Sequence, residues 1–268
     1  MTRPGRNAYL LMALAALALA ALPFLFWYAT WFGRALNDAQ LDEYFADHAR
    51  PRHAQHALVQ LGERLSRHQN VARWYPQVVA QANSPNPELR QTAAWIMGQD
   101  RAYQPFHDAL GRLIHDPVEM VRRNAALGLA AFRDAGARPE LLAMLRPFTI
   151  VSPAPGVLRY RLKTGEYVNP GTLVARVGSV EVRAAVPGEV RALDAADGAP
   201  AAAGQALVDL GADRNHVWEA LRGLYLVGEA SDLDDVRHYT HPLPGIPEIV
   251  QQQAIQTAQS IETRSPAP

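Results

Sequence analysis

The chain has 268 residues, of which 49% are hydrophobic and 19% are charged, a composition typical of a globular rather than a disordered protein. Basic and acidic residues balance at 26 each, so the charge gives no support for a protein that binds nucleic acid. The absence of cysteine excludes disulfides, thiolate metal sites, covalent c-type haem and a cysteine nucleophile.

The first predicted element is a transmembrane helix over residues 8–32, preceded by a short cytoplasmic segment, 1–7. The segment 8–32 contains no charged residue, and as a helix it would rise roughly 37 Å, enough to cross a hydrocarbon core of about 30 Å. Aromatic residues crowd its C-terminal end, where a membrane interface is expected. A cleaved signal peptide is the alternative, because Ala16-Leu17-Ala18 has the form of a cleavage site.

The charges that flank this segment predict its orientation. Arg3 and Arg6 precede it, whereas Arg34 is soon followed by Asp38 and Asp42. Because the more basic side stays in the cytoplasm, the N-terminus is expected inside and the rest of the chain outside. In a bacterium this predicts a single-pass protein of the inner membrane whose bulk lies in the periplasm.

Beyond Arg34 the chain reads as repeated helices over 38–148 and again over 213–264, followed by a tail, 265–268. Four stretches carry apolar residues at helical spacing with an alanine in register: Ala57, Ala93, Ala125 and Ala254. Helix pairs that recur in this way predict an α-solenoid, because no pair buries its apolar face alone.

The stretches "NPELRQTAAWIMG" and "DPVEMVRRNAALGLAAF" resemble HEAT repeats of a short-repeat variety. The repeat period is shorter than the usual HEAT length. The resemblance implies a helical array in which Arg90 and Arg122 form a polar ladder between repeats, the alternative being direct contact with a ligand.

Residues 149–212 interrupt the helices with an inserted β module. Two halves of this segment repeat each other, since Pro155-Gly156, Gly165, Gly171 and Gly178 recur 32 or 33 residues later as Pro187-Gly188, Gly198, Gly204 and Gly211. Glycine turns between short alternating strands predict two paired hairpin units. The segment resembles the barrel-sandwich hybrid of the biotinyl/lipoyl-carrier and membrane-fusion families.

The same residues argue against a carrier protein. In the carrier families a lysine at the tip between the halves receives the cofactor, but this tip, Val177 to Val180, contains none. The chain's single lysine, Lys163, precedes the Gly165 turn of the first half. We therefore expect no cofactor. Membrane-fusion adaptors place a long α-hairpin between the halves, and here only Ser179 and Val180 stand there.

Neither a catalytic centre nor a metal site is predicted. No phosphate-binding loop, dinucleotide fingerprint, serine elbow or zinc-protease motif is present. His48, His53 and His56, with Asp42, Glu43 and Asp47 nearby, form a possible metal group, but surface histidines are the simpler interpretation. Bilin lyases also contain short HEAT-like repeats and are the one enzyme alternative.

The aromatic residues of the helices, which include Trp95 and the stretch from Trp218 to Tyr225, have the spacing of core residues. Any that are exposed would anchor a partner, because interface hot spots favour Trp, Tyr and Arg. Trp74, Tyr75, Arg122 and Arg123 are the candidate partner-binding residues.

The order of anchor, HEAT-like helices, inserted lipoyl-like module and final helices also resembles bacterial membrane-anchored HEAT-repeat proteins. The predicted fold is mainly α with an inserted β region. The predicted function is a non-enzymatic, membrane-anchored scaffold or adaptor for an integral membrane complex, either a transporter or a respiratory enzyme. No nucleic acid or small-molecule substrate is expected. The alternative is a reduced membrane-fusion-type periplasmic subunit of an export system.

Overall fold

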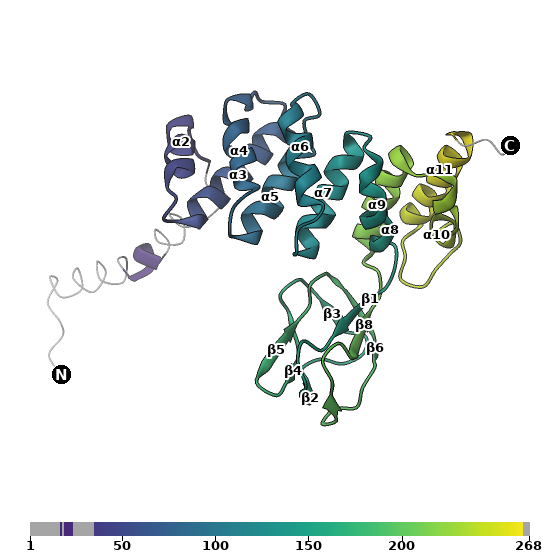
Figure 1. The fold of residues 1–268 in the computed structure, drawn as a ribbon. Coiled ribbons are helices and arrows are strands. Elements are labelled where there is room, and N and C mark those ends of the chain that lie inside the picture. The colour runs from purple at the N-terminus through teal and green to yellow at the C-terminus, as the bar shows by residue number, and fades with distance from the viewer. Residues whose placement is uncertain (1–16, 18, 24–34, 265–268) are drawn as a thin grey trace, which may run out of the picture. The chain divides into compact units, whose positions relative to one another are not determined.

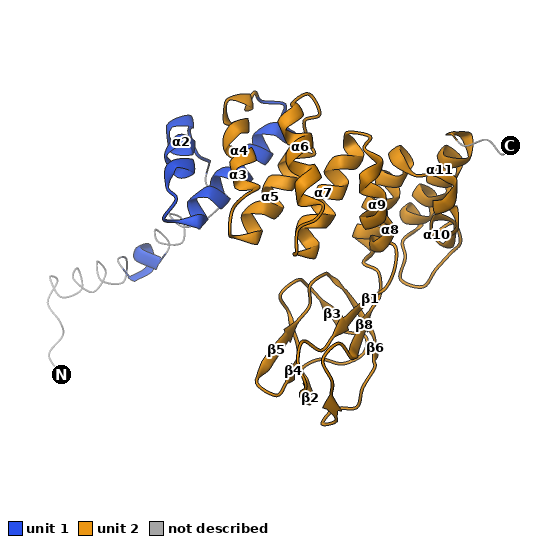
Figure 2. Cartoon of the chain, viewed as in Figure 1, with its two compact units in different colours: residues 1–69 blue, residues 70–268 orange. Residues whose placement is uncertain are grey.

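The computed structural model of the chain describes Leu17, residues 19–23 and residues 35–264 (Figure 1). Two compact units divide the chain at residue 69, as Figure 2 shows. Within the described residues, no helix is long and apolar enough to cross a membrane. Apart from Leu17 and residues 19–23, the predicted transmembrane segment 8–32 lies outside the described residues, as do the segment 1–7 and the tail 265–268.

In the first unit, α2 (Asp38–Ala46) and α3 (Pro51–Ser66) form a helical hairpin. Asn37 and Gln40 cap α2 reciprocally, each side chain accepting a hydrogen bond from the other's backbone N–H, which satisfies two N-terminal donors. The hairpin closes on an apolar core of Leu41, Phe45, Leu58 and Leu61. Burial of these side chains supplies its stability.

The second unit contains four helix pairs, which Figure 1 shows in succession. Each pair has a first helix, and these are α4 (Tyr75–Gln81), α6 (Gln104–Leu113), α8 (Arg138–Met144) and α10 (Leu233–His238). The second helices are α5 (Pro87–Met97), α7 (Glu119–Ala131), α9 (Arg214–Val227) and α11 (Glu248–Arg264). Short 3-10 turns, Ala72–Trp74, Ala135–Ala137 and Ala230–Asp232, precede α4, α8 and α10. The second helices pack against one another in chain order, α5 on α7, α7 on α9 and α9 on α11.

Fully buried alanines recur on these packed helices. Ala93, Ala125 and Ala254, which the sequence aligns, are all 0% exposed. Ala220 on α9 is also 0% exposed and completes the series. Ala220 stands before Gly223 in α9 as Ala125 stands before Gly128 in α7. The two glycines pack alike, because an added Cβ would meet Leu141 of α8 at 2.9 Å in the first case and Leu110 of α6 at 2.8 Å in the second. The sequence pattern alone did not predict that α9 carries a further repeat of this alanine.

Aspartates in the turns link each repeat to the one before it. Each caps its own turn by accepting a backbone N–H two or three residues away, and each also accepts a side-chain hydrogen bond from the preceding repeat. Such charge-assisted bonds hold repeats in register. The donor and acceptor pairs are Tyr75 and Asp100, Arg90 and Asp116, His107 and Asp134, and Arg138 and Asp232.

The β module lies between α8 and α9, inside one helix pair. Its eight strands are β1 (Phe148–Val151), β2 (Gly156–Tyr160), β3 (Tyr167–Val168), β4 (Leu173–Val177), β5 (Val180–Arg183), β6 (Gly188–Leu193), β7 (Pro200–Ala201) and β8 (Ala206–Leu210). They form two antiparallel sheets, ordered β1-β8-β6-β3 and β5-β4-β2-β7. A shared apolar core between the sheets includes Leu158, Val174, Val190 and Leu207.

The two halves of the module interlock with the symmetry that the duplicated glycines predict. β2 pairs with β7 of the second half, and β6 pairs with β3 of the first. Gly165 and its counterpart Gly198 have φ values of +90° and +83°, a region that glycine enters without a steric penalty. At Gly156 an added Cβ would approach the nitrogen of Gly178 to 2.9 Å, which explains the glycine in that turn.

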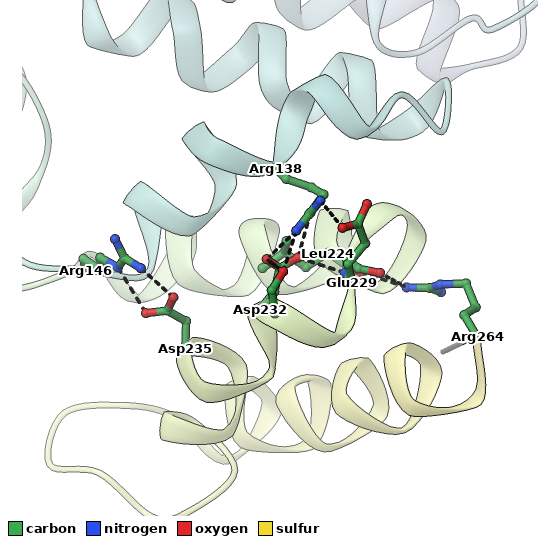
Figure 3. Close-up of polar contacts among 9 residues, drawn as sticks. Arg138, Arg146, Leu224, Glu229, Asp232, Asp235 and Arg264 are labelled. Carbon is green, nitrogen blue, oxygen red and sulfur yellow. Dashed lines mark hydrogen bonds and ion pairs between the residues drawn. The ribbon is translucent and has the colours of Figure 1, made fainter. Parts of the chain in front are cut away.

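The helical array is held together across the inserted module. Arg138 at the start of α8 pairs with Asp232, and Arg146 just after α8 pairs with Asp235 of α10 (Figure 3). Arg264 at the end of α11 donates to the carbonyl oxygens of Leu224 and Gly228, so it caps the C-terminal end of α9. Residues at the ends of α8 therefore bond directly to residues in and just before α10, and no residue of the β module takes part.

Candidate functional site

A groove of about 610 Å³ follows the second helices of the four pairs; we call it the α5–α11 groove. Each of the four helices contributes side chains to its wall. The lining residues are Trp95 from α5, Gly98 and Gln99 from the two positions after it, Asn124, Leu127, Gly128, Ala130 and Ala131 from α7, Glu219, Arg222, Gly223, Tyr225 and Leu226 from α9, and Gln253 and Gln256 from α11.

Three glycines line this groove. Gly98 lies so close to α7 that an added Cβ would stand 2.9 Å from the Cα of Gly128. Gly128 and Gly223 continue the line on α7 and α9, where an added Cβ would collide with leucines of the adjoining helices. Because these positions have no side chain, the helices that carry the groove pack closely against their neighbours.

Two large aromatic side chains line the groove and remain exposed. Trp95 is 48% exposed and Tyr225 is 43% exposed. This corrects the prediction that both would be core residues. Their helical spacing is compatible with burial, but no described segment lies over them on the groove side. An exposed Trp and an exposed Tyr on one concave surface are typical of protein-binding sites.

The polar lining of the groove is mainly amide. Asn124 donates to the carbonyl oxygen of Gln91, and Gln253 donates to the hydroxyl of Thr257. The charged lining residues are Glu219 and Arg222. Amides donate and accept hydrogen bonds, so such a wall can pair with the backbone of a bound polypeptide.

Trp74 and Tyr75, predicted as partner-binding residues, lie in the core instead. Trp74 is 1% exposed and Tyr75 is 5% exposed. The Tyr75 hydroxyl donates to Asp100 at 2.5 Å, and burial together with this bond raises the pKa of Tyr75. The Tyr75 ring packs 4.6 Å from that of Phe106. These contacts leave neither residue on a surface.

Arg122 and Arg123, the other two predicted partner-binding residues, are also engaged within the chain. Arg122 donates to Glu140 at 3.1 Å and to the carbonyl oxygen of Asp116 at 2.8 Å, as the predicted ladder requires. Arg123 is 5% exposed, and its Nη1 lies 2.8 Å from Nδ1 of His216. The contacts of Arg122 and Arg123 are therefore contacts within the chain, and Arg123 is buried where α7 packs against α9.

Arg123, His216, Asp213 and Tyr167 form a group that we call the Arg123 cluster, and it joins α7, α9 and the β module. Asp213 accepts hydrogen bonds from the backbone of His216 and from the hydroxyl of Tyr167 in β3. Burial, and then the bond to Asp213, raise the pKa of Tyr167 to about 12. Burial, with the Arg123 guanidinium adding to it, lowers the pKa of His216 to about 4. A neutral His216 accepts from the Arg123 guanidinium, so the cluster depends on that protonation state.

A larger cleft of about 960 Å³ lies between the β module, α8, α10 and the loop before α11. Arg146 makes two hydrogen bonds to Asp235 on its wall, and the Tyr239 hydroxyl donates to the carbonyl oxygen of Leu145. These polar groups hold helices together.

The histidines of the first unit are placed by aromatic and polar contacts. The His53 ring stacks on Tyr44 with centroids 4.1 Å apart, and its Nδ1 lies 2.8 Å from Oδ2 of Asp47. His56 is buried and packs edge-on against Tyr44. In the part of the chain that the structure describes, no group of three or more His, Asp or Glu side chains is placed to hold a metal ion. Lys163 is exposed in the turn between β2 and β3.

Comparison with protein families gives one match, to the family model for HEAT repeats, over residues 75–149. The matched segment runs from the start of α4 through α8 to the first residues of β1. No curated protein matches the chain. The chain therefore contains a HEAT-repeat region, set in a fold of helices with an inserted β region.

Proposed function

We propose that this chain is a non-enzymatic scaffold that binds a segment of a partner protein in the α5–α11 groove. HEAT repeats suggest a protein-interaction scaffold, and a solenoid offers an extended surface for such binding. The observation that carries the proposal is the exposure of Trp95 and Tyr225 on a groove to which four successive second helices contribute. Rigid aromatic side chains bind partners at a small cost in conformational entropy.

The proposal includes a location. The uncharged segment 8–32 anchors the chain in the bacterial inner membrane, and Arg3 and Arg6 keep the N-terminus in the cytoplasm. The groove then faces the periplasm. The partner is an integral membrane complex, either a transporter or a respiratory enzyme, because an anchor raises the effective concentration of the scaffold near other membrane proteins.

Co-purification from membranes tests the proposal. The full chain is isolated in mild detergent beside the double variant Trp95→Ala/Tyr225→Ala. A matched control, Val151→Ala/Val157→Ala, removes side chains of the β module that are 48% and 50% exposed. We expect a defined membrane complex with the wild type and the control, and its loss with the groove variant. Equal recovery with all three chains would contradict a groove-binding scaffold.

The identity of the recovered complex separates the scaffold from the second candidate, a reduced membrane-fusion-type export subunit. The interlocked halves of the β module favour that candidate, while the short turn at Gly178-Ser179 leaves no long hairpin to reach a channel. An ATPase–permease pair in the complex would support export, and an oxidase or cytochrome would support a respiratory accessory role.

A further inference from the structure

Glu219 is the acidic residue of the α5–α11 groove. It lies on α9, lines the groove and is partly buried. Among the described residues, no hydrogen bond and no ion pair to its carboxylate is present. Burial raises the pKa of Glu219 above its ordinary value of 4.5. A carboxylate that loses water without gaining a partner is destabilised in its charged form.

The nearest cation on the same helix does not neutralise Glu219. Arg222 is exposed, and its guanidinium lies over the ring of Trp218, 4.6 Å from the ring centroid. Burial raises the pKa of Glu219, the charge of Arg222 lowers it by less, and the charge of Asp213 adds to the increase. Among the described residues, Arg222 thus makes no hydrogen bond and no close ion pair with Glu219, and its guanidinium stays on the Trp218 ring.

Two buried carboxylates in the same unit are each matched by an arginine. Asp116 is 8% exposed and receives two hydrogen bonds from Arg90, at 2.7 and 2.9 Å. Asp232 is 2% exposed and receives two from Arg138, both at 2.8 Å. Glu219 differs from both aspartates, and it lines a groove that is open to an incoming partner. The missing cation is thus one that a partner can supply.

We infer that the occupant of the α5–α11 groove is a polypeptide segment that places a lysine or arginine side chain against Glu219. The inference rests on the proposed function and names the chemistry of its partner. The faces of Trp95 and Tyr225, in the same groove, favour a neighbouring cation through their ring electrons. The amides of Gln99, Gln253 and Gln256 supply hydrogen bonds to the backbone on either side.

Selection from a phage-displayed library of random twelve-residue peptides tests the inference with the full chain in detergent. We expect the wild type to select peptides enriched in lysine or arginine, and Glu219→Lys to select peptides enriched in aspartate or glutamate. Glu219→Gln should weaken a selected basic peptide at least tenfold. Glu88→Gln, which removes an exposed charge from α5 outside the groove lining, should leave its affinity unchanged.

Replacing the basic residue of that peptide with glutamine should also weaken binding, but with little further loss in Glu219→Gln, because the two groups form one interaction. Peptides that require Trp95 and Tyr225 yet show no basic enrichment, or an affinity unchanged by Glu219→Gln, would overturn the inference and leave the scaffold proposal intact. Failure of the wild type to select any peptide that depends on Trp95 and Tyr225 would overturn both.

Discussion

Arg138 and Asp232 form a two-bond ion pair between residues 94 positions apart, on opposite sides of the inserted β module in the chain (Figure 3). Nε and Nη2 of Arg138 each lie 2.8 Å from an oxygen of Asp232, whose side chain is 2% exposed. The same carboxylate accepts the backbone N–H of Glu229 and so shapes the turn before α10. The pair connects two first helices of consecutive repeats without the β module taking part.

Removal of Arg138 should therefore destabilise the chain far more than removal of Arg146. In Arg138→Met the buried carboxylate of Asp232 loses its cation, and we expect the free energy of unfolding to fall by about 3 kcal/mol. Arg146 also makes two hydrogen bonds to an aspartate, but its side chain is 60% exposed, so Arg146→Met should cost less than about 1 kcal/mol. Urea unfolding followed by helical circular dichroism measures both. Equal losses would contradict the account.

The β module should be removable. Replacement of residues 148–212 by a short Gly/Ser linker keeps Asp213, which caps α9 through the backbone N–H groups of Asn215 and His216. It also keeps the pairs of Arg138 and Arg146. We expect a cooperative urea transition and full helical circular dichroism from the remaining residues. Loss of the helical signal would mean that the module completes the helical core.

Acid should weaken the fold through His216. Its pKa of about 4 lies below the ordinary value of 6.5, so between these values the unfolded chain binds a proton that the folded chain does not. Stability is therefore present above pH 6.5 and is lost as the pH falls toward 4, by roughly 3 kcal/mol for this one group. In His216→Asn, whose amide oxygen can still accept from Arg123, that part of the pH dependence should disappear.

Denaturant unfolding at pH 7, 6, 5 and 4 measures this effect as the difference between wild type and variant. His115→Asn replaces an exposed histidine in the turn after α6 and serves as the matched control. If His216→Asn and His115→Asn change the pH dependence equally, the Arg123 cluster does not hold His216 neutral.

Topology is testable independently of the groove. Alkaline phosphatase fused after Pro268 should be active, because Arg3 and Arg6 retain the N-terminus in the cytoplasm and the rest of the chain is exported. A β-galactosidase fusion at the same place should be inactive. Replacing both arginines with glutamate should lower phosphatase activity. High β-galactosidase activity in the unaltered chain would reverse the predicted orientation.

The helical repeats and the duplicated β segment could be predicted because each leaves a local pattern. Ala93 and Ala125 recur at a fixed place on amphipathic helices, and Gly165 and Gly198 mark turns whose positive φ favours glycine. The sequence did not predict that Ala220 is equivalent to these alanines, because the β module separates α9 from α7 in the chain. The packing of Gly223 against Leu141 shows that Ala220 occupies the equivalent position.

The groove could not be read from the sequence, because exposure depends on which neighbour covers a side chain. Trp74 and Trp95 both fit a helical apolar pattern, yet Trp74 is 1% exposed and Trp95 is 48% exposed. Arg123 is predicted beside Arg122 as a partner-binding residue, but α9 covers it and His216 accepts from it. Glu219 has no sequence motif around it, and its lack of a counter-ion is a property of the folded groove.

Site-specific photocross-linking in intact membranes tests the central claim most directly. A photoreactive phenylalanine analogue replaces Trp95 or Tyr225 in the full chain, and Arg112, an exposed residue of α6 outside the groove lining, is the control position. We expect one discrete cross-linked partner protein from both groove positions, none from position 112, and its loss from position 95 in the presence of Glu219→Lys. Cross-links to the same partner from position 112, or none from either groove position, would contradict a scaffold that binds through the α5–α11 groove.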